Sequence, residues 1–293
     1  MKKIVIITML IITICVNGLS QSHPQYSFNS DGDYASLFSD SDSDYSEYWS
    51  IKLLLILSDI NNKEKVQLYH RLYEIEHTSL ILYRTLDGDT LEFHPLPDPT
   101  GRERSLDFGA AIANNTEGSI DYTHKLWFTA PVTKIDPALF LEEVTYIKFP
   151  DTQGLQYKSS PFINVRNLKQ MEGKDVVNDQ VLISADSTLI AAAVAGLDAF
   201  TIPENVKAIG AGAFRGCTLK TITVSANVKS IGASAFDQCE NLESVTILSK
   251  EPIQIDESAF NTNKELKYKI YVPKECYKAY RKANPNIKKR FKK

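Results

Sequence analysis

Apolar residues return to the same relative positions at a constant interval in the C-terminal half of the chain. The segment Ile202–Cys217, IPENVKAIGAGAFRGC, is followed by Val224–Cys239, VSANVKSIGASAFDQC. A third copy with small insertions runs from Val245 to Phe260. A repeat of this length is typical of a solenoid, in which each coil buries its apolar face only against its neighbours.

Each copy holds two apolar residues separated by one threonine. A spacing of two predicts a short β-strand with both apolar side chains on the inward face. The threonines between them, Thr201, Thr223 and Thr246, are then expected to face outward. A stack of β-branched residues suits a parallel sheet with one strand per coil. The apolar pairs are Phe200 with Ile202, Ile222 with Val224, and Val245 with Ile247.

Further inward positions follow in each copy and end in an alanine and a phenylalanine. A small residue beside a large one leaves room for the ring to lie across the core. Gly210 and Gly232 each follow an isoleucine where the chain must turn, and we expect a positive φ at both, which glycine tolerates. The predicted core positions are Val206, Val228, Ile209, Ile231, Ile255, Ala213, Phe214, Ala235, Phe236, Ala259 and Phe260.

These residues resemble the BspA-like leucine-rich repeats of bacterial surface proteins, whose motif is I-P-x-x-V-x-x-I-G-x-x-A-F-x-x-C. The copy from Ile202 to Cys217 fills the motif without a gap. The copy from Val224 to Cys239 departs at Ser225, where the motif has proline, and the third copy lacks the glycine and the cysteine. The segment from Ile270 to Tyr280 looks like the closing strand and short helix of the family.

The resemblance implies an α/β, β-rich fold: a leucine-rich-repeat solenoid with one short parallel strand per coil, an inserted β-hairpin, an N-terminal mixed cap and a short C-terminal helix. Degenerate copies extend upstream, because Phe128, Val132, Ile135 and Phe140 keep the same spacings. The hairpin is expected from residues 181–183 to 189–192, with its turn at Asp186 and Ser187.

The N-terminal part predicts export. Lys2 and Lys3 precede an apolar run from Ile4 to Val16 and then Gly18, Leu19 and Ser20, which is the pattern of a secretory signal. The apolar run is shorter than the roughly 20 residues of a spanning helix. Cys15 offers an alternative, a lipoprotein signal, although such signals normally place Gly, Ala or Ser where this chain has Ile14.

The chain is thereby divided into five parts. Residues 1–20 are assigned to the signal peptide, 21–50 to a flexible linker rich in Ser and Asp, 51–119 to an N-terminal helix and β-hairpin cap, 120–287 to the repeats and 288–293 to a basic tail. In the cap, the expected hairpin joins residues 80–83 to 91–93 through a turn at Asp87 and Gly88. The tail is interpreted as a frayed, solvated end.

Cysteine usage leaves two interpretations open. Without Cys15 the chain holds Cys217, Cys239 and Cys276, an odd number. Cys217 and Cys239 occupy equivalent positions on adjacent coils, about 5 Å apart along the sheet. They are either two buried small side chains in a ladder or a disulfide.

Catalytic and metal-binding patterns are weak. The five histidines lie outside the repeats from Phe200 to Phe260, and no phosphate-binding loop, nucleophile elbow or zinc spacing occurs. The acidic run Asp40–Asp44 begins like a calcium loop, but Tyr45 stands where glycine is needed and Ile51 where the closing glutamate belongs. We therefore expect no enzyme activity, no cofactor and no metal.

A binding role is the favoured prediction. The formal net charge is −3 and the pI about 6.0, which gives no signal for nucleic acid. We expect a monomeric, secreted or cell-surface adhesion module for an extracellular protein or glycan, with membrane association only if Cys15 is lipidated. The alternatives are a structural spacer or scaffold and, more weakly, a carbohydrate-active enzyme sited in the cap. The expected binding face comprises Thr201, Thr223, Thr246, Lys220, Glu243 and Lys269.

Overall fold

The computed structural model describes residues 51–52, 62–90, 96–97, 103–104, 108–110, 112–116, 123–140, 142–160, 163–260 and 268–293. The predicted signal peptide, the acidic linker and the expected strand at 91–93 lie outside these residues. No described helix is both long and apolar enough to cross a bilayer.

Helices are few among the described elements, and strands dominate. The helices are α4 (Asn62–Thr78) and α5 (Tyr277–Ala283), and the 3-10 turns are η1 (Pro137–Leu139), η2 (Lys274–Cys276) and η3 (Pro285–Ile287). The strands before the repeats are β1 (Leu80–Thr85), β2 (Leu96–Pro97), β3 (Glu103–Arg104), β4 (Ile112–Thr116), β5 (His124–Phe128), β6 (Lys134–Ile135), β7 (Val144–Lys148), β8 (Gln156–Tyr157), β9 (Gln170–Glu172), β10 (Val176–Val177), β11 (Val181–Ile183) and β12 (Thr188–Ala192). The strands of the repeats are β13 (Ala199–Thr201), β14 (Ala208–Ile209), β15 (Thr221–Val224), β16 (Ser230–Ile231), β17 (Ser244–Ile247), β18 (Gln254–Ile255), β19 (Lys269–Tyr271) and β20 (Phe291–Lys292).

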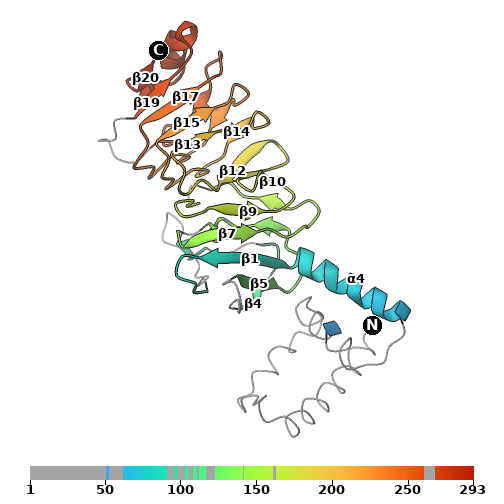
Figure 1. The fold of residues 1–293 in the computed structure, drawn as a ribbon. Coiled ribbons are helices and arrows are strands. Elements are labelled where there is room, and N and C mark those ends of the chain that lie inside the picture. The colour runs from blue at the N-terminus through green and yellow to red at the C-terminus, as the bar shows by residue number, and fades with distance from the viewer. Residues whose placement is uncertain are drawn as a thin grey trace.

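These strands stack into an elongated solenoid, with α4 at one end and the C-terminus at the other (Figure 1). Three larger sheets follow the stack. Their strand orders are β4-β5-β1-β7-β9, β10-β11-β12-β14-β16-β18 and β13-β15-β17-β19-β20. The predicted fold class is therefore confirmed.

The repeats contribute one strand per coil to each of two parallel sheets. Phe200 pairs with Ile222, and Ile222 with Val245, so the coils stack in the register expected from the sequence. On the other side, Ile209 pairs with Ile231 and Ile231 with Ile255. The apolar side chains between the two sheets form one continuous buried cluster.

A column of aromatic rings runs through this core. The rings of Phe214 and Phe236 stack with centroids 5.3 Å apart and planes 13° apart, and those of Phe236 and Phe260 are 5.0 Å and 12° apart. The column continues to Tyr268, 5.0 Å from Phe260. Each ring packs against the ring of the next coil instead of contacting water. The column therefore links the coils along the axis of the solenoid.

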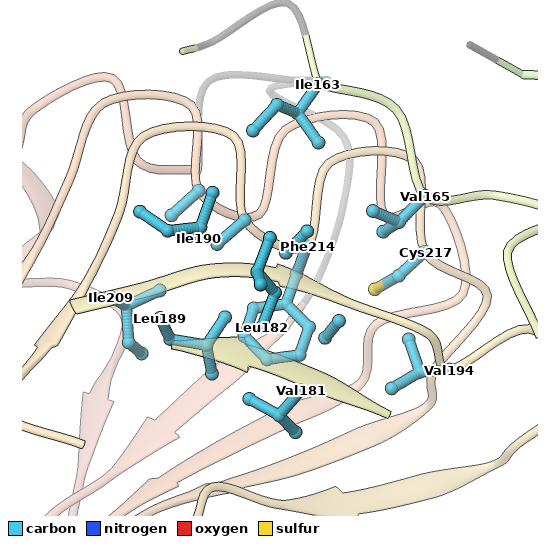
Figure 2. Packing of buried hydrophobic residues seen from close by; sticks show 14 of the residues in the cluster. Ile163, Val165, Val181, Leu182, Leu189, Ile190, Val194, Ile209, Phe214 and Cys217 are labelled. Atoms are coloured by element: carbon cyan, nitrogen blue, oxygen red, sulfur yellow. The ribbon is translucent and has the colours of Figure 1, made fainter. Parts of the chain in front are cut away.

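The inserted hairpin forms as expected and shares the core of the repeats. β11 and β12 pair antiparallel, and β12 then pairs parallel with β14 of the first repeat. Figure 2 shows Val181, Leu182 and Leu189 of the hairpin beside Ile209 and Phe214. The hairpin thus connects the upstream part of the solenoid to the regular repeats.

The upstream copy is also confirmed. Val132, Ile135 and Phe140 are buried, and β6 pairs with β8 in parallel, as expected of successive coils. α4 is a helix within the expected N-terminal cap, with Leu72 and Ile75 buried and Tyr73 exposed.

The expected cap hairpin is wrong in its pairing. β1 lies between β5 and β7 and is antiparallel to both, with Tyr83 opposite His124 on one side and Ile147 on the other. Both edges of β1 are therefore occupied by strands that lie far downstream in the sequence. Residues 51–119 and 120–287 share a sheet at this point, so the expected boundary between cap and repeats is not a break in the fold.

The role expected of two glycines is also corrected. Gly210 and Gly232 are not among the residues with positive φ; those positions are Gly212 (φ 69) and Gly216 (φ 76) in the first coil. A Cβ on Gly210 would lie 2.8 Å from the carbonyl oxygen of Leu189, and one on Gly232 would lie 2.8 Å from the backbone nitrogen of Ala211. The two glycines are needed because neighbouring coils approach closely there.

The C-terminal residues do not form the expected frayed tail. Phe291 is buried, and β20 adds a parallel strand to β19. The apolar ring of Phe291 packs 5.7 Å from that of Tyr280 of α5. Residues 288–293 thus belong to the closing end of the solenoid.

Candidate functional site

The outward face of the repeat sheet carries a straight row of polar side chains. Thr201 pairs with Thr223, Thr223 with Thr246, and Thr246 with Tyr271. Thr201 and Tyr271 are exposed, and Thr223 and Thr246 are half-buried by their neighbours in the row. We call the outward side of β13, β15, β17 and β19 the strand face.

The strand face is held flat by the core directly behind it. Ile222, Val224, Val245 and Ile247 alternate with the threonines and are all buried. Since successive residues of a strand point to opposite sides, burial of these four fixes the direction of Thr223 and Thr246. The alternation predicted from the sequence is confirmed.

The three charged residues of the predicted site lie together at the start of the same strands. The backbone nitrogen of Glu243 donates a hydrogen bond to the carbonyl oxygen of Lys220 at 2.8 Å, and that of Lys269 donates to Glu243 at 2.9 Å. All three side chains are exposed. The Nζ of Lys220 lies 3.0 Å from an oxygen of Asp198 on the preceding coil.

An open hollow of about 690 Å³ lies over these charged residues. Lys220, Glu243 and Lys269 line it, whereas the three threonines do not. The six predicted residues therefore fall into a threonine row and a charged hollow on neighbouring parts of one face. The other lining residues are Glu240, Asn241, Leu242, Ser244 and Tyr271.

Sequence reasoning missed Tyr271, Asn241 and Ser244. Tyr271 occupies the position of the threonines in the strand Ile270-Tyr271-Val272, so the alternation of the repeats was sufficient to find it. Asn241 and Ser244 lie just before and at the start of β17, where the repeat pattern has no fixed residue type. Their side chains add amide and hydroxyl groups to the hollow.

The hollow brings together polar groups of several kinds. It offers cations, carboxylates, an amide, a hydroxyl and one partly exposed aromatic ring on a rigid sheet. Such a combination provides hydrogen bonds and a flat apolar contact.

His77, His124 and Glu142 do not line the hollow. His77 stacks on Tyr73 within α4 at 3.7 Å, and His124 is buried beside Tyr83 with centroids 5.1 Å apart. Glu142 makes an ion pair with Arg166 at 3.3 Å on the surface. Over the described ranges, no group of three or more His, Cys, Asp or Glu residues is placed to hold a metal ion.

Cys217 and Cys239 form a buried pair of free thiols. Their sulfur atoms lie 3.0 Å apart, and the Cys239 thiol also contacts the carbonyl oxygen of Phe214 at 3.0 Å. Burial raises the pKa of the Cys239 thiol well above its ordinary value, because the thiolate would be desolvated. This arrangement agrees with the ladder interpretation of the two cysteines.

The comparison with protein families matches the repeats. Residues 193–287 fit the family described as BspA type Leucine rich repeat region, in six copies. This segment contains the strand face and the aromatic column. Residues 193–287 are therefore similar to a BspA-type leucine-rich repeat region.

Three solved structures are also similar over part of the chain. A leucine rich cell surface protein from Faecalibacterium prausnitzii is 24% identical with a TM-score of 0.38, covering 50% of this chain and 47% of that one. A leucine-rich repeat protein from Eubacterium ventriosum is 18% identical with a TM-score of 0.24, covering 42% and 38%. The pneumococcal vaccine antigen PcpA is 14% identical with a TM-score of 0.25, covering 47% and 54%.

The chain thus spans about half the length, or less, of each of these solved proteins. No curated protein matches the sequence.

Proposed function

We propose that the protein is a non-catalytic binding module of the cell surface or the extracellular space, and that its strand face contacts a protein or a glycan. The observation that carries this proposal is the row Thr201, Thr223, Thr246 and Tyr271, set in parallel register beside the charged hollow. The N-terminal apolar run after Lys2 and Lys3 supports export.

Rigidity favours this face as a binding surface. The threonines are fixed by buried neighbours on the same strands, and the strands by the aromatic column behind them. A surface that is already ordered loses little conformational entropy on binding, so more of the contact energy remains as affinity. We propose that the protein adheres as a monomer through this single continuous face.

The test introduces negative charge into the threonine row. The double variant Thr223→Glu/Thr246→Glu and the unchanged full chain are applied to a glycan array and to a panel of extracellular matrix proteins. The proposal expects at least one ligand of the unchanged chain to be lost by the variant, because two carboxylates would stand in the middle of the contact.

A matched control uses the other sheet of the same coils. Ser230 and Gln254 are paired through β16 and β18, as Thr223 and Thr246 are through β15 and β17. The variant Ser230→Glu/Gln254→Glu adds the same charge and is expected to keep every ligand. If both variants bound the ligands equally well, the strand face would not be the binding surface. If the unchanged chain bound no ligand, the spacer or scaffold role would be favoured.

A further inference from the structure

The C-terminal end of the solenoid carries a concentration of positive charge that the rest of the chain lacks. Residues 268–293 contain eight lysines, two arginines and one glutamate, whereas the whole chain has 33 basic and 36 acidic residues. The preceding residues are therefore acidic overall. We call the following exposed cations the basic end: Lys274, Lys278, Arg281, Lys282, Lys288, Lys289, Lys292 and Lys293.

The basic end is held in place by buried polar contacts. The Tyr280 hydroxyl, which is fully buried, lies 2.9 Å from the carbonyl oxygen of Ser249 and 2.8 Å from that of Glu251. Asn284 donates its amide to the carbonyl oxygen of Ile253 at 3.2 Å and accepts from the backbone nitrogen of Ile255 at 3.1 Å. These contacts dock one side of α5 against the last repeat.

Docking of that side leaves the cations on the other. Lys278, Arg281 and Lys282 are spaced by three and four residues, so they share the solvent side of α5. Lys288 and Lys289 follow η3. Lys292 is the last residue of β20 and Lys293 follows it, and Phe291 of the same strand is buried. β20 contacts α5, and Lys293 reaches the ring of Tyr277 in that helix, so the cations at the end of the chain are held near those of α5.

These cations lack carboxylate partners. Among the described residues, no side chain of the basic end makes an ion pair, although ion pairs occur along the rest of the solenoid, as at Lys220 and Asp198 or Arg215 and Asp237. Like charges held close together without partners repel each other. A polyanion would relieve that repulsion and release its own counterions.

The surroundings of the cations restrict the kind of polyanion. Two of the four tyrosine rings in residues 268–293 are covered by cations: Arg281 and Lys293 lie over Tyr277 at 5.5 and 5.3 Å, and Arg290 lies over Tyr268 at 4.4 Å. Tyr280 is buried, and Tyr271 belongs to the row of the strand face. Rings covered in this way offer no open platform for stacking bases. No large apolar residue between 274 and 293 is exposed, so nothing there is suited to insert into a lipid bilayer.

We propose that the basic end binds an anionic polysaccharide through its sulfate or phosphate groups. Lysine side chains act as mobile point charges that fit anionic groups spaced along a polymer. The basic end adjoins the strand face, because Lys292 pairs with Tyr271. Lys278 and Lys282 of α5 lie outside both the threonine row and the lining of the hollow, so a test at these two residues does not depend on the role proposed for the strand face. Binding there would hold the C-terminal end of the solenoid against a charged matrix.

The test measures binding of the full chain to immobilised heparin, a sulfated polysaccharide, and to polyglycerol phosphate, at 0.15 M NaCl. Binding to either is expected and identifies which anionic group is recognised. The variant Lys278→Glu/Lys282→Glu is expected to bind about tenfold or more weakly, because two attractions become repulsions. Affinity is also expected to fall as salt rises.

A matched control separates the basic end from net charge. Lys169 and Lys207 are exposed and lie on other coils, and Lys169→Glu/Lys207→Glu changes the net charge by the same amount. This control is expected to bind within about twofold of the unchanged chain. Equal weakening in the two variants, no binding to either polymer, or tighter binding to single-stranded DNA or to anionic lipid vesicles would overturn the proposal.

Discussion

Two adjacent coils of the repeat, residues 202–217 and 224–239, have nearly the same sequence and the same backbone path. They differ in which residue types occupy the two positions with a left-handed backbone. Gly212 and Gly216 of the first coil have φ of 69° and 76°, and Ser234 and Gln238 stand at the same places in the second with φ of 54° and 57°. The hydrogen bonds continue across the difference: Phe214 donates to Ala235 and Phe236 to Ala259.

The comparison shows which residues determine the coil. A left-handed backbone costs a residue with a side chain roughly 1–2 kcal/mol, and the second coil bears that cost twice. The second coil keeps its shape because the burial of residues common to both coils, above all Phe214 and Phe236, stabilises the fold by more than this backbone cost. Packing therefore dominates over local backbone preference in this solenoid.

The largest effect is expected on removing a ring of the column. Phe236→Ala should lower the free energy of unfolding by about 3–5 kcal/mol, because the ring is buried between Phe214 and Phe260. Chemical denaturation measures the loss. Tyr73→Ala, at an exposed position of α4, serves as the control and should change stability by less than about 0.5 kcal/mol. A loss under about 1 kcal/mol for Phe236→Ala would argue against a packed column.

A smaller cost is expected where both coils keep glycine. Gly210→Ala should destabilise the protein by about 1–3 kcal/mol, because the new Cβ would meet the carbonyl oxygen of Leu189. The measurement is the denaturant midpoint. At an unconstrained site the same substitution stabilises by about 0.4–1 kcal/mol through the unfolded state. Stabilisation here would show that the coils do not approach closely at Gly210.

The difference between the coils predicts a gain. Ser234→Gly should raise the free energy of unfolding by about 0.5–1 kcal/mol, because glycine removes the strain of a left-handed residue. Gly212→Ala, the reverse change in the first coil, should lower it by about 1 kcal/mol. If both substitutions shifted stability in the same direction, the two positions would not be conformationally equivalent.

The cysteines at equivalent positions of the two coils allow a prediction about chemical reactivity, which requires no substitution. In the native protein, Cys217 and Cys239 should resist alkylation while the half-buried Cys276 reacts, since burial keeps the Cys239 thiol protonated by raising its pKa and leaves both sulfurs inaccessible. Peptide mass spectrometry after labelling resolves the three sites. Labelling of Cys217 or Cys239 as fast as Cys276 would mean that the ladder opens to solvent.

The regular part of the fold could be predicted from the sequence because each coil repeats the contacts of the one before it. One correct alignment of Ile202 with Val224 places Phe214 on Phe236 and Thr201 beside Thr223. The strand face followed from the same alternation. Its binding role stays a prediction, since a repeat determines a frame and not a partner.

The upstream sheet could not be predicted in this way. The partners of β1 come much later in the sequence, and nothing local in residues 80–85 distinguishes a hairpin from long-range pairing with β5 and β7. The strand at the end of the chain escaped prediction for a related reason. Phe291 is one apolar residue among lysines, and only burial against Tyr280 turns that segment into a strand.

Neighbouring coils are joined through their stacked rings, and a double-mutant cycle on Phe214 and Phe236 measures that coupling. Phe214→Leu, Phe236→Leu and the double variant are compared by denaturant unfolding. We expect a coupling of about 0.5–1.5 kcal/mol between the two sites, as for other aromatic pairs in contact. Additive effects, within about 0.3–0.5 kcal/mol, would contradict it, because residues that do not touch change stability independently.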